Sequence, residues 1–181
     1  MPLLFRVPTL ADAQMLLDWR TSPEIASKMA TEVPYDLDRQ KAWLGACNAR
    51  KDYVHFIIMQ SSDNKPIGYL SYSRIDWQKR ECEMGYYAVL DKTKRHIGAY
   101  IPQYASDYCF HVLKMAKVFS VILSSNTRML ENIRRRNFRL AEQEDGNFYF
   151  EQLSSDFFLR DRWFPLEQTL AAFPPGQPEL A

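Results

Sequence analysis

The chain has 181 residues, the length of a single domain, since domains usually hold about 100–200 residues. Its residues are 46% hydrophobic and 14% aromatic, which is enough to fill a core and excludes general disorder. A formal net charge of +1 excludes a large sequence-independent nucleic-acid footprint, and no apolar run approaches the ~20 residues that span a bilayer. We therefore expect no nucleic-acid partner and no membrane partner.

The N-terminal part of the chain predicts one strand followed by helices. Thr9 has the residue type of an N-cap, and Ser22 followed by Pro23 suits an N-cap and the first helical position. Asp36 or Asp38 starts a third helix. The expected elements are a strand over residues 3–9 and helices over 10–20, 22–29 and 38–51.

The hydrophobic period then changes, and strands alternate with helices to the end of the chain. The expected elements are strands over 53–60, 67–76 and 81–90, a helix from Gly98 to about Met115, a strand over 118–125, a helix over 127–138 and one or two closing strands over 148–164. This order predicts the mixed α/β class with a central sheet: an N-terminal strand and helices, an antiparallel meander, then helix–strand–helix–strand. One domain is expected over 1–164, with a Pro-rich tail over 165–181.

The three cysteines, Cys47, Cys82 and Cys109, are odd in number and lie within apolar patterns. Buried free thiols in a reducing compartment explain them better than disulfides. The three histidines lie on different elements without metal-ligand spacing, so no metal site is predicted. The apolar run at the N-terminus is too short for a signal peptide, and we expect a cytoplasmic protein.

A basic cluster precedes the glycine at the start of the fourth expected helix, in "KTKRHIGAY" over residues 92–100. A helix N-terminus presents unpaired N–H groups and the positive end of the helix dipole, so it can bind an anion. Gly98 would let the backbone approach a diphosphate, and Lys94 and Arg95 would add charge. The alternative is a solvated basic turn.

Strand, phosphate-type loop, helix, strand and then "SSNTRMLENIRRRNF" occur here in an order that resembles the GNAT family of acyl-CoA N-acyltransferases. The resemblance covers about residues 3–150. It implies acetyl-CoA as co-substrate, with the diphosphate at the loop. It also implies that the strand over 81–90 splays from the strand over 118–125 and so exposes backbone groups that bind pantetheine. The cofactor-binding residues that it implies are Tyr87, Ala88, Val89, Lys94, Arg95, His96, Ile97, Gly98, Ala99, Tyr100 and Asn126.

A narrower resemblance lies upstream, in "LLDWRTSPEIASKM", "QKAWL", "YVHFIIM", "KPIGYLSYSRID" and "ECEMGYYAV". These segments are similar to the branch that acetylates nucleotide-linked amino sugars, the pseudaminic-acid pathway type, and the ribosomal-protein branch shares a looser version. The sugar branch implies an acceptor held by the early helices, with Trp19 stacking and Arg20 on a phosphate. The implied acceptor-side residues are Trp19, Arg20, Met29, Tyr35 and Trp43. The two tryptophans suit the core equally well.

Two positions depart from the family pattern. His96 replaces the first loop glycine, where an imidazole either faces the diphosphate or is merely tolerated. Ile133 stands where the family has a tyrosine that protonates the departing CoA thiolate, so the sequence does not settle the general acid. The substitute donors that it offers are Asn132, Ser125, Tyr104 and water. A non-catalytic acyl-CoA-binding module is therefore an alternative.

A base for the acceptor amine is expected on the strand over 81–90. Alternation places Glu81, Glu83, Gly85 and Tyr87 on one face, and Glu83 occupies the place from which related enzymes remove the amine proton. His55 is the second candidate base. The alternatives are a solvent-facing carboxylate and a structural histidine. The leading hypothesis is acetylation of a nucleotide-linked amino sugar; a protein N-terminus or a small amine is the alternative acceptor, and a homodimer is compatible with the sequence.

Overall fold

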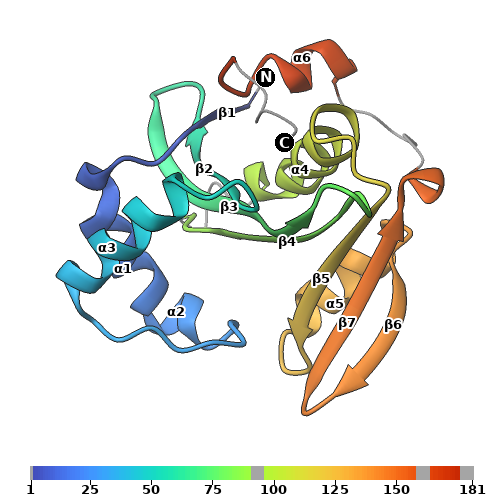
Figure 1. Cartoon of the computed structure of the whole chain (residues 1–181), viewed down its shortest axis with the longest axis horizontal. Coiled ribbons are helices and arrows are strands. Elements are labelled where there is room, and N and C mark those ends of the chain that lie inside the picture. The colour runs from blue at the N-terminus through green and yellow to red at the C-terminus, as the bar shows by residue number, and fades with distance from the viewer. Residues whose placement is uncertain (1, 91–95, 158–163, 176–181) are drawn as a thin grey trace.

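The structure, a computed structural model, describes residues 2–90, 96–157 and 164–175. Its described strands form a seven-stranded sheet in the order β1-β2-β3-β4-β5-β7-β6. Neighbouring strands are antiparallel except for β4 and β5, which are parallel. The mixed α/β class with a central sheet is confirmed (Figure 1). The strands are β1 (Leu3–Arg6), β2 (Val54–Gln60), β3 (Lys65–Asp76), β4 (Glu81–Ala88), β5 (Lys117–Leu123), β6 (Arg139–Glu144) and β7 (Asn147–Leu153).

Helices pack on both faces of this sheet. The helices are α1 (Ala13–Thr21), α2 (Pro23–Ala26), α3 (Leu37–Asn48), α4 (Ile101–Asp107), α5 (Thr127–Arg134) and α6 (Leu166–Leu170). On one face, α1 and α3 place Leu16 and Leu44 against Ile57 and Tyr69. On the other face, α4, α5 and the residues Ala172 and Phe173 that follow α6 contribute to the larger core cluster.

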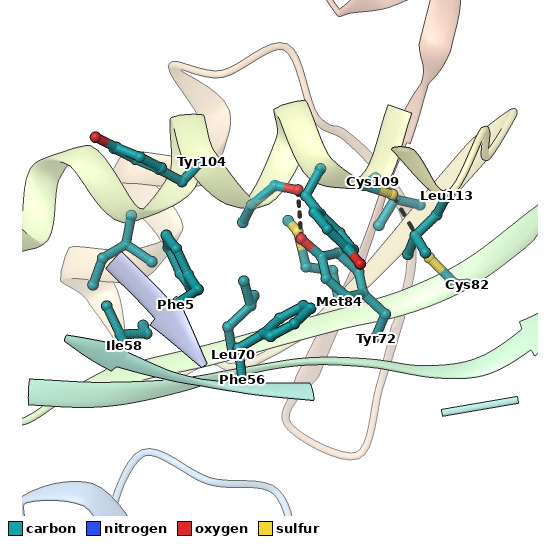
Figure 2. Packing of buried hydrophobic residues seen from close by; sticks show 14 of the residues in the cluster. Phe5, Phe56, Ile58, Leu70, Tyr72, Cys82, Met84, Tyr104, Cys109 and Leu113 are labelled. Atoms are coloured by element: carbon teal, nitrogen blue, oxygen red, sulfur yellow. Dashed lines mark hydrogen bonds between the residues drawn. The ribbon is translucent and has the colours of Figure 1, made fainter. Parts of the chain in front are cut away.

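The centre of the larger core is α4, all seven residues of which are buried. The fully buried Tyr72 on β3 donates its hydroxyl hydrogen to the carbonyl of Ala105 on α4 at 2.6 Å, which satisfies a polar group inside the core (Figure 2). A π-helical turn, Tyr108–Val112, follows α4 and places the sulfur of Cys109 3.7 Å from that of Cys82. All three cysteines are buried and free, as predicted.

Two of the predicted helix starts are confirmed, and one of them has a side-chain cap. Pro23 begins α2 with Ser22 as the preceding N-cap residue, but the Ser22 hydroxyl donates to the Trp19 carbonyl at 2.7 Å and does not cap α2, which ends at Ala26. Asp36, and not Asp38, caps α3 by accepting the N–H of Arg39 at 3.0 Å. The helix expected from Gly98 begins as a 3-10 turn, Ile97–Tyr100, that leads into α4. Strand β6 was not predicted, because its six residues are all exposed and carry no apolar alternation.

The segment expected to be a tail from residue 165 packs into the domain. α6 lies within it, and Phe173 stacks on Phe5 of β1 with ring centroids 4.0 Å apart. Ala172 and Phe173 are buried, and the Ala172 carbonyl accepts the N–H of Phe5 at 2.8 Å. The Pro-rich composition was misleading here, because apolar residues beside the prolines cover the end of the core.

Candidate active site

Strands β4 and β5 separate after three residue pairs. Their pairing runs from Glu81 opposite Lys117 to Glu83 opposite Phe119, and the Ser120 hydroxyl then donates to the Met84 carbonyl at 2.9 Å. Beyond this point β4 continues to Ala88 without a strand on that side among the described residues, while β5 pairs with β7. The two strands visibly diverge in Figure 1. The divergence leaves backbone groups of β4 open to a ligand in the middle of the sheet.

Three adjoining cavities surround this separation. The outer cleft, about 480 Å³, lies between α2, the end of β4, residues 98–99 and the start of α5. The inner cavity, about 120 Å³, lies between β4, β5, α4 and α5. The aromatic pocket, about 400 Å³, lies between the sheet, α1, α3 and residues 29–36. Met29 and Tyr86 line all three cavities, so this is the point where they meet.

The floor of the aromatic pocket is made by small residues of β3 and β4. Ser71 pairs with Gly85, and a Cβ added to Gly85 would meet only the Ser71 hydroxyl, at 3.9 Å. Tyr69 and Tyr87, the next pair along, stack at 5.7 Å and form one wall. Glu83 lines the pocket from the same face of β4, which confirms the predicted alternation.

The outer cleft is lined by several of the predicted cofactor-binding residues. Tyr87, Ala88, Gly98, Ala99 and Asn126 line it. Asn126 caps α5, because its side-chain oxygen accepts the N–H of Met129 at 3.4 Å. A Cβ on Gly98 would lie 3.1 Å from Cδ1 of Leu90, so a larger residue there would press on the wall of the cleft. Three cationic side chains also line this cleft: Lys28, Arg128 and Arg135.

The remaining predicted cofactor residues are placed differently. The N–H of Val89 donates to the Ile67 carbonyl at 2.7 Å and is not open to a ligand. Ile97 is buried, His96 is exposed, and Tyr100 packs against Phe164 at 5.4 Å; none of them lines the outer cleft, the inner cavity or the aromatic pocket. Lys94 and Arg95 lie outside the described residues.

Glu83 is the carboxylate on the pocket side of β4. Its side chain is 26% exposed, and Oε2 lies 3.2 Å from Nη1 of Arg74. The Arg74 side chain is 79% exposed, so this ion pair is screened by water and holds the carboxylate only weakly. Glu83 is therefore able to turn toward a ligand in the aromatic pocket.

His55 lies behind the pocket and does not line it. It is 4% exposed, and burial lowers the pKa of its imidazole to about 4. Nδ1 lies 2.7 Å from the Tyr69 hydroxyl and Nε2 lies 2.7 Å from Oδ1 of Asn48. Both ring nitrogens are occupied, so His55 does not meet an amine directly.

The predicted acceptor-side residues divide into two groups. Arg20, Met29 and Trp43 line the aromatic pocket. Trp19 does not line it but packs edge-on against Tyr87 at 6.5 Å, and Tyr35 is 68% exposed with its hydroxyl on Asp18 at 2.8 Å. Two further pocket residues, on the strands, were not predicted from the sequence. Pairing β3 with β4 in register would have placed the missed residues Tyr69 and Ser71 opposite Tyr87 and Gly85.

Ile133 lies in the inner cavity, where it is 6% exposed. Tyr86 on β4 lines the same cavity, and its hydroxyl donates to the Met129 sulfur at 3.7 Å. Burial raises the pKa of Tyr86 to about 12, so the phenol keeps its proton at neutral pH.

Residues 2–139 match the sequence profile described as the acetyltransferase (GNAT) domain. The chain belongs to this family. It is an acyl-CoA-dependent N-acyltransferase, and GNAT enzymes use acetyl-CoA. No curated protein sequence matches the chain.

Several solved structures share this fold. A spermidine N-acetyltransferase from Vibrio cholerae, in complex with CoA and spermine, superposes with a TM-score of 0.78 at 14% sequence identity. The superposition covers 86% of this chain and 98% of the other chain. A dodecameric structure of spermidine N-acetyltransferase from the same organism has a TM-score of 0.73 at 13% identity, with coverages of 89% and 99%. A domain from Methanocaldococcus jannaschii has a TM-score of 0.70 at 18% identity, with coverages of 83% and 97%.

Two further features bear on binding. Within residues 2–90, 96–157 and 164–175, no helix is long and apolar enough to cross a membrane. In the same ranges, no group of three or more histidine, cysteine, aspartate or glutamate side chains is placed to hold a metal ion.

Proposed function

We propose that this enzyme moves the acetyl group of acetyl-CoA to the primary amine of a small molecule seated in the aromatic pocket. The observation that carries the proposal is the meeting of the outer cleft and the aromatic pocket at Met29 and Tyr86. A thioester held in the outer cleft and an amine held in the aromatic pocket reach each other at that point. The amine nitrogen bonds to the carbonyl carbon, its proton passes to Glu83 directly or through water, and the thiolate leaves with a proton from the site.

A nucleotide-linked amino sugar is the acceptor that Arg20 favours. Its guanidinium donates to the Thr31 hydroxyl at 2.9 Å, and burial lowers the pKa of this group from its usual range. No carboxylate of the described chain lies within ion-pair distance of it. A partly desolvated guanidinium with open donors suits a phosphate, and Trp43 nearby suits a flat base or sugar face.

A polyamine is the second candidate acceptor. Glu32, Asp36 and Glu83 line the same pocket, and carboxylates would attract a polycation. The Vibrio cholerae structure with spermine shows that this fold accommodates such an acceptor in another protein.

Thiol release from acetyl-CoA over a panel of amines tests the proposal. The panel contains a nucleotide-linked 4-amino sugar, spermidine and a peptide with a free N-terminus. Release with the sugar nucleotide, weakened at least tenfold in Arg20→Gln, is the expected result. Release with spermidine that Arg20→Gln leaves unchanged would move the acceptor to the polyamines. Acetyl-CoA binding in calorimetry without release for any amine would identify a non-catalytic acyl-CoA-binding module.

A further inference from the structure

A chain of hydrogen bonds runs behind the wall of the aromatic pocket. It links Asn48 on α3 to His55 on β2, His55 to Tyr69 on β3, and Tyr69 to Tyr53 at the start of β2. The successive distances are 2.7, 2.7 and 3.2 Å. Tyr53 and Tyr69 line the pocket, whereas Asn48 and His55 do not. The chain therefore connects two tyrosines of the pocket wall to two residues that do not line the pocket.

The direction of every hydrogen in this chain follows from its far end. The Asn48 side-chain nitrogen lies 3.1 Å from the Pro8 carbonyl, which can only accept, so this atom is the donor and the amide oxygen faces His55. That oxygen can only accept, so Nε2 of His55 carries the hydrogen. Burial lowers the imidazole pKa to about 4, so the ring is neutral and Nδ1 is bare.

The bare Nδ1 nitrogen determines in which direction the two tyrosine hydroxyls donate their hydrogens. Nδ1 of His55 accepts the hydroxyl hydrogen of Tyr69, and the Tyr69 oxygen in turn accepts the hydroxyl hydrogen of Tyr53. Burial raises the pKa of Tyr69 well above its usual range, so both phenols stay protonated. The hydroxyl hydrogens are thus committed to the chain, and oxygen lone pairs remain for the pocket.

We propose that Asn48 and His55 are positioning residues that make the oxygens of Tyr69 and Tyr53 hydrogen-bond acceptors for the N–H groups of the acceptor amine. The inference rests on the proposed function, because it assumes an amine in the aromatic pocket. A neutral primary amine has two N–H donors and one lone pair. When the tyrosine oxygens accept its N–H groups, the lone pair is left to face the thioester at Met29 and Tyr86. The same wall disfavours a carbonyl or carboxylate, which would place two acceptors against each other.

The first test reads the His55 tautomer and needs no substrate. In the protein labelled with 15N-histidine, the chemical shifts of Nδ1 and Nε2 show which nitrogen carries the hydrogen, and His55→Phe identifies the signal among the three histidines. The expected result is a neutral ring with hydrogen on Nε2. A hydrogen on Nδ1 would overturn the inference even if the enzyme acetylates an amine. An amine panel without turnover, in a protein with the Nε2 tautomer, would instead overturn the proposed function.

The second test is kinetic. Asn48→Leu removes the acceptor that fixes the tautomer, so the KM for the acceptor amine should rise about tenfold while acetyl-CoA affinity is unchanged. Tyr69→Phe should have a similar effect, and the double variant should be no worse than Tyr69→Phe alone, because both changes act through one hydroxyl. Met59→Leu is the control. Met59 lies on β2 with His55 but is not part of the hydrogen-bond chain, so this change should leave KM unchanged.

Additive effects of Asn48→Leu and Tyr69→Phe would show that Asn48 acts independently of the tyrosine and would overturn the inference. So would an unchanged KM in Asn48→Leu once the tautomer has been seen to change. Thermal melting of each variant shows whether the fold is intact, and the tautomer of His55 in Asn48→Leu gives a readout that a loss of packing alone would not move.

Discussion

At the scale of single residues, Glu83 is the side chain on which the proposed chemistry depends most. It lines the aromatic pocket and is held only by the exposed Arg74. Glu83→Gln keeps the shape and removes the base, so kcat should fall by about 10²–10⁴ if proton removal limits turnover. Acetyl-CoA affinity, measured by calorimetry, should barely change. Glu81→Gln, two residues upstream on the same face but paired with Lys117 at 2.9 Å, is the matched control and should keep its activity. An undiminished rate in Glu83→Gln at neutral pH would show that water, and not Glu83, removes the amine proton.

We expect the departing thiolate to take its proton from Tyr86, because the apolar side chain of Ile133 has none to donate. Tyr86 lines the inner cavity and the outer cleft, and its pKa of about 12 keeps it protonated. Tyr86→Phe should therefore lower kcat by about 10²-fold, within the range of general-acid effects. Tyr149→Phe, on β7, should have no effect.

A tyrosine in place of Ile133 offers a second check on the same step. Ile133→Tyr should restore part of the turnover lost in Tyr86→Phe, provided that the ring fits without the ~1–3 kcal/mol cost of overpacking a site that is 6% exposed. In the native background it should leave turnover level, because Tyr86 already supplies the proton. The measurements are turnover and melting temperature of the native protein, Tyr86→Phe, Ile133→Tyr and the double variant. Faster turnover of Ile133→Tyr in the native background would show that Tyr86 does not hold the role.

Residue identity alone predicted part of this site. Strand alternation placed Glu83 on the correct face because β4 is regular from Glu81 to Ala88. The partners of His55 were not predictable in this way, since Asn48 and Tyr69 come from a helix and another strand. Tyr35 was expected on the acceptor side with the early helices, and in the structure it is exposed and donates its hydroxyl hydrogen to Asp18, a contact that the sequence does not indicate.

At the scale of elements, β4 separates two binding surfaces, and Gly85 tests one of them. A side chain at this position enters open space, since only the Ser71 hydroxyl is within 4 Å of the added Cβ. Gly85→Val should therefore fill the floor of the aromatic pocket without straining the backbone. The KM for the acceptor should rise at least tenfold, and acetyl-CoA affinity should stay the same. Weakened acetyl-CoA binding instead would show that the cofactor, and not the acceptor, lies over this floor.

Gly98 tests the other surface, at the helix start beside the outer cleft. Gly98→Val adds a Cβ at 3.1 Å from Leu90 and two methyl groups beyond it. Acetyl-CoA should bind about tenfold more weakly, which corresponds to about 1.4 kcal/mol. Gly45→Ala, in α3 where the added Cβ meets only Leu10 at 3.9 Å, is the control. Unchanged affinity in a folded Gly98→Val protein would place the diphosphate elsewhere.

Elements with an apolar period were predicted well, and those without one were not. β5 alternates buried and less buried residues from Lys117 to Leu123 and was recognised. β6 is exposed along its whole length and forms the sheet edge, so its sequence carries no inward-facing pattern. The separation of β4 from β5 is a property of the sheet and was expected only through the family resemblance.

At the scale of the whole molecule, the two ends of the described chain close the core together. Phe173 comes from the segment after α6 and lies between three aromatic rings. Its ring centroid is 4.0 Å from that of Phe5, 4.3 Å from Tyr108 and 5.3 Å from Phe56. The Pro-rich composition of "PPGQPELA" predicted a tail, and nothing in it indicates that Phe173, the residue just before it, contacts the aromatic rings of the core. The packed domain therefore extends beyond the boundary expected at 164.

Phe173→Ala measures how much this closure contributes. The ring is 8% exposed, and truncating a buried phenylalanine typically costs about 3–5 kcal/mol, so the free energy of unfolding in urea should fall by that amount. The control is Leu140→Ala, which should lower the free energy of unfolding only slightly because Leu140 is 50% exposed on the edge strand.

Phe5→Ala should give a loss similar to that of Phe173→Ala, and the double variant should lose less than the sum of the two, because each change removes the same ring contact. Acetyl-CoA affinity at a temperature where the variant is folded should be unchanged, since neither ring lines any of the three cavities around β4. A loss in Phe173→Ala no larger than that in Leu140→Ala would mean that the segment after α6 lies on the core without stabilising it.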